Sequence, residues 1–89
     1  MLTLRVTNPH EDKVVRVWLE PMGEDYWMRP REAFTFEFDE REFSASMCGA
    51  HFDVSWDDGD LIVWAGAIAK VRDQSGTELE CGHQRPPVD

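Results

Sequence analysis

Two short clusters of cysteine and histidine are the residues of this chain with the clearest capacity for chemistry. "CGAH" contains Cys48 and His51, and "CGH" contains Cys81 and His83. Thiolate and imidazole are the ligands that zinc prefers, and two of each would complete a tetrahedral site. However, the Cys-x-His spacing is tighter than the usual gap between paired zinc ligands. We therefore expect that no metal binds and that both cysteines are small buried residues. The alternative is a metal-binding domain that uses these four residues.

Two other metal sites have partial ligand sets in the sequence. His51, Cys81 and His83 match the two-His, one-Cys set of a copper site, but no methionine follows His83 as the axial ligand. The stretch "DDGD" at 57–60 resembles the start of a calcium loop, but the chain becomes apolar after Asp60, where further oxygen ligands are required. We expect this stretch to be a turn, and we expect no cofactor.

The remaining polar residues form no recognisable catalytic motif. In the predicted strands, Glu37 and Asp53 occupy the alternate positions whose side chains face water. The serines lack a local nucleophile motif. Cys48 and His51 would need direct contact to form a thiolate–imidazole pair, which their spacing does not provide. There is no glycine-rich phosphate loop. We therefore predict that the protein is not an enzyme.

Alternation of apolar and polar residues dominates the chain and predicts strands. Asp58-Gly59 predicts a hairpin, because these residues accept the positive φ angles of a tight primed turn, and "DQSG" at 73–76 predicts a second turn. A short strand is expected around 26–28. The positions that alternation assigns to the core are Leu4, Val6, Val15, Val17, Leu19, Phe34, Phe36, Phe38, Phe52, Val54 and Trp56.

Short strands at regular spacing indicate the fold class. About seven strands separated by turn residues predict a single antiparallel β-sandwich of the immunoglobulin-like or cupredoxin-like class. "DEREFSASMCGA" fits a short helix or a strand, and we expect a loop with at most one helical turn near 40–48. We expect one domain over residues 1–82. The consecutive prolines in "GHQRPPVD" predict a flexible tail over 83–89.

The stretch "WLEPMGEDYWMRPREAFTFEF" combines turn residues with aromatic residues in a Trp-x-Glu-Pro-x-Gly…Tyr…Pro…Phe pattern. The matching positions are Trp18, Glu20, Pro21, Gly23, Tyr26, Pro30 and Phe34. In this pattern, which covers about a quarter of the chain, the sequence resembles a small bacterial β-domain family that has no assigned activity. The resemblance implies a β fold and implies no function.

The charge of the chain constrains its partners. Eighteen acids and nine bases give a net charge of −9, and between Glu37 and Asp60 there are eight acids and only one base, Arg41. Such a surface repels nucleic acid and anionic membranes and attracts a basic protein. No apolar run approaches the ~20 residues that span a bilayer, and "MLTLRVT" lacks the pattern of a secretory signal. We expect a cytoplasmic protein without nucleic-acid or membrane partners.

These features predict a small acidic binding module for protein–protein interaction. One specific form is an inhibitor or immunity-type protein for a basic partner, and sugar binding by stacked tryptophans is a further class. Trp18 shares the parity of Arg16 and Glu20, so we expect its ring to stay partly exposed and to anchor an arginine of the partner. The predicted partner-binding residues are Trp18, Glu20, Tyr26, Trp27, Asp57, Asp58 and Asp60.

Overall fold

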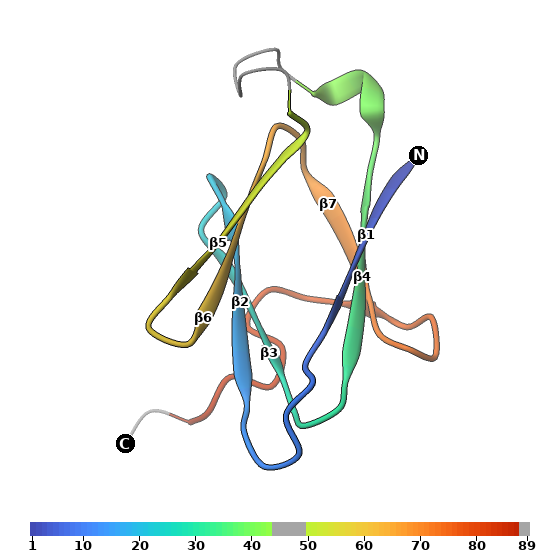
Figure 1. Cartoon of the computed structure of the whole chain (residues 1–89). Helices are drawn as coiled ribbons and strands as arrows, with labels where there is room; N and C mark the ends of the chain where they lie inside the picture. Colours follow the sequence, from blue (N-terminus) through green and yellow to red (C-terminus); the bar gives the residue numbers. More distant parts are fainter. Residues whose placement is uncertain (44–49, 88–89) are drawn as a thin grey trace.

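The computed structural model describes residues 1–43 and 50–87 and shows two four-stranded sheets that face each other (Figure 1). Sheet A has the order β1-β4-β7-β8 and sheet B the order β3-β2-β6-β5. The strands of sheet A are β1 (Leu2–Thr7), β4 (Ala33–Phe38), β7 (Ala69–Arg72) and β8 (Glu78–Leu79). Those of sheet B are β2 (Val15–Glu20), β3 (Glu24–Met28), β5 (Phe52–Asp57) and β6 (Asp60–Ala65). The predicted all-β sandwich is confirmed.

One strand pair departs from the predicted antiparallel arrangement. β2 and β6 run parallel, with Val17 opposite Leu61 and Leu19 opposite Val63. Turn residues predict the pairing of strands that follow each other in the chain, as in the β2–β3 and β5–β6 pairs. β2 and β6 are distant in sequence, so no local signal indicated their contact or its direction.

The predicted turns lie where the sequence places them. Asp57 pairs with Asp60, and the residues between them, Asp58 and Gly59, have φ angles of 49° and 87°, as a primed two-residue turn requires. The turn after β7 closes with Gly76 at a φ of 89°. A 3₁₀ turn, Glu40–Glu42, lies in the segment where at most one helical turn was expected, and residues 44–49 of this segment lie outside the described residues.

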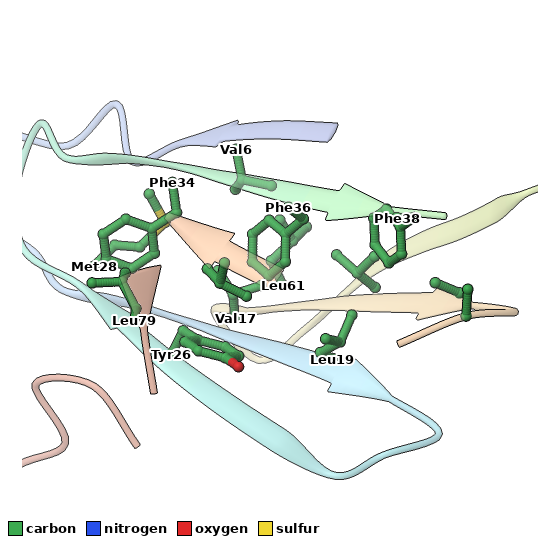
Figure 2. Packing of buried hydrophobic residues seen from close by; sticks show 14 residues of the cluster. Val6, Val17, Leu19, Tyr26, Met28, Phe34, Phe36, Phe38, Leu61 and Leu79 are labelled. Atoms are coloured by element: carbon green, nitrogen blue, oxygen red, sulfur yellow. The ribbon is translucent and has the colours of Figure 1, made fainter. Parts of the chain in front are cut away.

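The core is built on β4, an inner strand of sheet A. Phe34, Phe36 and Phe38 alternate along it and are fully buried (Figure 2). Tyr26 packs edge-on against Phe36, with ring centroids 5.9 Å apart. The residues of sheet B that pack into the same core are Val17, Leu19, Tyr26, Met28, Leu61, Val63 and Ala65. Three phenylalanines on one strand therefore meet three strands of the opposite sheet.

Two residues predicted in the core are exposed. Val54 and Trp56 on β5 are 47% and 65% exposed. The predicted direction of their side chains is correct, because the register sets Val54 opposite the buried Val63 and Trp56 opposite the buried Leu61, on the inner face of sheet B. The prediction was wrong because β5 is an edge strand, and only its first residue, Phe52, packs against the core.

Asn8 is a buried polar residue that joins two connections of the chain. Its Nδ2 donates to the carbonyl oxygens of Lys13 (2.8 Å), Met28 (3.2 Å) and Arg29 (3.1 Å), and its Oδ1 accepts from the backbone N–H of His10 (3.0 Å). A buried amide is tolerated when its donors and acceptor are satisfied. Asn8 therefore fixes the loop after β1 to the end of β3.

The residues that follow β8 lie along β3. The backbone N–H of Trp27 donates to the carbonyl of His83 (3.0 Å), and that of Gly82 donates to the carbonyl of Asp25 (2.7 Å). The side chain of Gln84 donates to the carbonyl of Trp27 (2.7 Å). Residues 83–85, which we expected in a tail, are therefore attached to the edge of sheet B.

Asp25 is the buried acid that this attachment covers. It is 4% exposed and accepts hydrogen bonds from the Nε of Arg85 (2.9 Å) and the Nε1 of Trp27 (2.8 Å). The hydrogen bonds from Arg85 hold the pKa of Asp25 well below its ordinary value of 3.8, although burial acts in the opposite direction. The charged carboxylate is thus the form that the folded protein favours.

Replacement of Phe36 by alanine tests the importance of the phenylalanines on β4. Phe36→Ala should lower the free energy of unfolding by roughly 3–5 kcal/mol, because it removes a fully buried ring. Thr3→Ala, on the exposed face of β1, should change it by less than about 0.5 kcal/mol. Urea denaturation followed by circular dichroism measures both, and a Phe36→Ala variant as stable as the wild type would contradict the core described above.

Replacement of Arg85 by glutamine tests the Asp25–Arg85 pair through its pH dependence. A carboxyl group with a lowered folded-state pKa adds stability above its ordinary pKa and loses it as the pH falls towards the folded value. Arg85→Gln raises the folded pKa of Asp25, so the variant should be less stable than the wild type at neutral pH. This difference should shrink between about pH 5 and about pH 2.

Urea denaturation across this pH range measures the difference, with Arg31→Gln as the control because its partner, Glu11, is an exposed loop residue. A difference between wild type and Arg85→Gln that stays constant down to the lowest pH would show that Asp25 is not stabilised by Arg85.

Candidate functional site

The outer face of sheet B carries aromatic side chains that no second layer of described residues covers. Side chains alternate along a strand, so every second residue of sheet B points away from sheet A. The strand register assigns to this outer face Asp25 and Trp27 of β3, Arg16, Trp18 and Glu20 of β2, Asp60, Ile62 and Trp64 of β6, and Asp53, Ser55 and Asp57 of β5. We call Trp18, Trp27, Ile62 and Trp64 the tryptophan face.

One part of this face already holds a cation of its own. The guanidinium of Arg16 lies 4.7 Å from the ring centroid of Trp18 and 5.0 Å from that of Trp27. Its Nε donates to Asp60 Oδ2 (2.9 Å), and the indole Nε1 of Trp18 donates to the same oxygen (3.3 Å). Arg16 therefore occupies both rings and neutralises Asp60.

Trp64 lies in a similar setting without such a cation. It is 44% exposed, and the register places Glu20 of β2 on one side of it and Asp53 of β5 on the other. Within residues 1–43 and 50–87, neither carboxylate takes part in an ion pair. A shallow hollow of about 280 Å³ is lined by Trp18, Glu20, Ile62 and Trp64. The ring of Trp64 and the unpaired carboxylate of Glu20 thus border an open space, and Asp53 is the cross-strand neighbour of Trp64.

The structure brings most of the predicted binding residues onto one face. Trp18, Glu20, Trp27 and Asp60 lie together on the outer side of sheet B, and Trp18 keeps part of its surface exposed as predicted. Asp57 has the same parity at the end of β5, with Asp58 in the adjoining turn. Asp60, however, is paired with Arg16 and is not free to steer a partner.

The prediction that Tyr26 contacts a partner is wrong. Tyr26 is 3% exposed and lies opposite Val17 on the inner face of sheet B. Burial raises the pKa of its hydroxyl group, which lies 3.2 Å from Glu24 Oε1. Alternation explains the result, because consecutive residues of a strand point to opposite faces and Trp27 already occupies the outer one.

Ile62 and Trp64 were missed by sequence reasoning. The segment "DLIVWA" is apolar at Leu61, Val63 and Ala65 and also at Ile62 and Trp64, so neither face is marked as the polar one. Only the pairing of β6 with β2 shows that Ile62 and Trp64 share the face of Trp18 and Glu20. That pairing is the parallel contact that the sequence did not indicate.

The alternative of a four-residue metal site does not fit the residues that the structure describes. The ring of His51 lies 4.8 Å from that of Phe43, which is itself 5.8 Å from Phe38, whereas His83 lies 5.6 Å from Phe34. Phe34 and Phe38 are separated by about 13 Å along β4, and a shared metal needs ligand bonds of about 2.0–2.3 Å. The site with Cys48, His51, Cys81 and His83 and its copper variant therefore do not form.

Cys48 lies outside the described residues. Within the part of the chain that the structure describes, no group of three or more potential ligands gathers at one place.

Comparisons with known proteins leave the site to be interpreted from its geometry. Neither the family models nor the curated proteins nor the solved structures contain a match to this chain. The resemblance of residues 18–38 to a bacterial β-domain family stays a prediction. No helix in the described residues has the length and apolar composition to cross a membrane.

Metal removal provides a direct test of the separation between His51 and His83. Because these residues lie at opposite ends of β4, incubation with EDTA should leave the melting temperature of the full chain unchanged. Circular dichroism before and after chelation measures it. A fall in melting temperature that zinc restores would show a structural metal, since such a metal contributes folding free energy directly.

Proposed function

We propose that the protein is a small acidic module that binds a basic partner protein, with no catalytic step of its own, and that Trp64 receives a cationic side chain of that partner. The observation that carries this proposal is the position of Trp64, exposed between the carboxylates of Glu20 and Asp53. A cation over a tryptophan face contributes about 0.5–1 kcal/mol when exposed and about 2 kcal/mol when desolvated.

The Arg16 contacts support arginine as the partner's residue. On the same face, a guanidinium lies over Trp18 and is held by the carboxylate of Asp60. Trp64, Glu20 and Asp53 provide the same kinds of groups, and the cation is the missing member. Arginine suits such a site better than lysine, because its planar group stacks on the ring while donating to carboxylates.

The charge of the whole chain supports a basic protein as the partner class. The net charge of −9 attracts a basic protein over long range and repels nucleic acid and anionic membranes. An inhibitor or immunity-type role is the specific form that we favour, because an enzyme acting on anionic substrates presents a cationic surface. We propose a cytoplasmic location for this interaction.

Trp64→Ala tests the site. Partners are captured from native lysate with the full chain, identified, purified and titrated by calorimetry. Trp64→Ala should weaken binding about 10–30-fold, equal to about 1.4–2 kcal/mol, as expected for an aromatic anchor at an interface. Its melting temperature should stay close to that of the wild type, because a half-exposed ring adds little stability.

Ile68→Ala is the matched control, since Ile68 is exposed but lies outside the tryptophan face. Glu20→Gln should weaken binding at low salt and have less effect at high salt, where charges are screened. A partner that binds Trp64→Ala and the wild type equally would contradict the proposed site, and capture of nucleic acid in place of a basic protein would contradict the proposed function.

A further inference from the structure

Sheet B has two edges, and the residues that the structure describes cover only one of them. The edge at β3 is occupied by the residues after β8, through the hydrogen bonds of Trp27 with His83 and of Gly82 with Asp25. Among the described strands β5 pairs with β6 alone, and its residues 53–57 are exposed. An edge strand presents unpaired backbone groups that can pair with another chain.

The β5–β6 turn shows which backbone groups face the open edge. A two-residue primed turn closes on a hydrogen-bonded pair, here Asp57 and Asp60. Hydrogen-bonded and non-hydrogen-bonded pairs alternate along an antiparallel ladder. The N–H and C=O groups of Phe52, Val54 and Trp56 therefore point away from β6, towards the open edge.

The side chains of β5 define what an added strand would meet. Val54 and Trp56 form an exposed apolar row on the side of the sheet that faces the core, beyond the reach of sheet A. Asp53 and Asp57 lie on the outer side. A strand beside β5 would therefore need apolar residues on one side and cationic residues on the other.

We propose that β5 binds an extended segment of a basic protein, in which apolar residues alternate with lysine or arginine, as an added strand of sheet B. This inference rests on the proposed function, because it names the segment of the same basic partner. Asp53 lies beside Trp64, so the added strand would run next to the tryptophan face. Backbone hydrogen bonds give affinity in this binding mode, and alternate side chains give specificity.

Charge favours this segment over a second copy of the chain. A second β5 would bring its own Asp53 and Asp57 to the edge, and each chain carries a net charge of −9. Charged residues on an edge strand are a common means of preventing self-pairing. The carboxylates that repel another copy attract a strand with cationic residues at the matching positions.

The test uses a short synthetic peptide of alternating valine and lysine and the full-length protein. Backbone hydrogen exchange, measured by NMR, should slow about tenfold at Val54 and Trp56 when the peptide is present at about ten times its Kd. A peptide with glutamate in place of lysine, and one with valines and lysines in separate blocks, should give no protection. These amides report pairing at the edge, which docking on the tryptophan face alone would not produce.

Two variants provide independent checks. Val54→Pro removes an N–H that points to the open edge and keeps the bonds to β6, so a folded Val54→Pro should bind the peptide about tenfold more weakly or worse. Val54→Thr keeps the N–H and is the control. The double variant Asp53→Lys/Asp57→Lys should bind the valine–glutamate peptide in preference to the valine–lysine peptide, and it keeps the test decisive if Val54→Pro does not fold.

Unchanged exchange at Val54 and Trp56 with a saturating amount of the valine–lysine peptide would overturn the inference. Protection that rises with protein concentration alone, together with a dimer in sedimentation equilibrium, would also overturn it, because a second copy would occupy the edge. Loss of partner binding in Trp64→Ala without protection of these amides would reject this inference and retain the proposed function. Protection of these amides, together with partner binding that Trp64→Ala does not weaken, would retain the edge site and reject the site at Trp64.

Discussion

The packing of three phenylalanines on β4 is the constraint on which the rest of the structure depends. Phe34 contacts His83 from the segment after β8, Phe36 contacts Tyr26 of β3, and Phe38 contacts Phe52 at the start of β5. Face-to-face sheets lie about 10 Å apart, and these rings fill that space along the length of the strand. The three rings thus contact β3, the start of β5 and the segment after β8.

The limits of this packing decide which surfaces stay open. β5 meets the core at Phe52 and then continues as an edge strand, so Val54 and Trp56 have the parity of core residues without a layer above them. On the outer side of the same sheet, no second layer of described residues covers Trp18 and Trp64. The two open surfaces meet along β5 and β6, where Asp53 lies opposite Trp64.

Much of the fold could be predicted from the sequence, because alternation gives the direction of each side chain. It identified the phenylalanines of β4, and Asp58-Gly59 identified the β5–β6 hairpin. Alternation does not show whether a second layer covers a face, which is why Trp56 was placed in the core. The candidate site could be predicted only in part, since the position of Trp64 depends on the parallel contact between β2 and β6.

The excess of acids has a spatial order that composition cannot show. Arg16 and Arg85 neutralise Asp60 and Asp25, two acids of the outer face whose side chains are 23% and 6% exposed. Within the described residues, Asp53 and Asp57 of β5 have no ion-pair partner. Charge is therefore compensated at Asp25, where burial makes an unpaired carboxylate costly, and left uncompensated at Asp53 and Asp57 beside the open edge. A basic partner would complete the neutralisation that the chain carries out elsewhere on the same face.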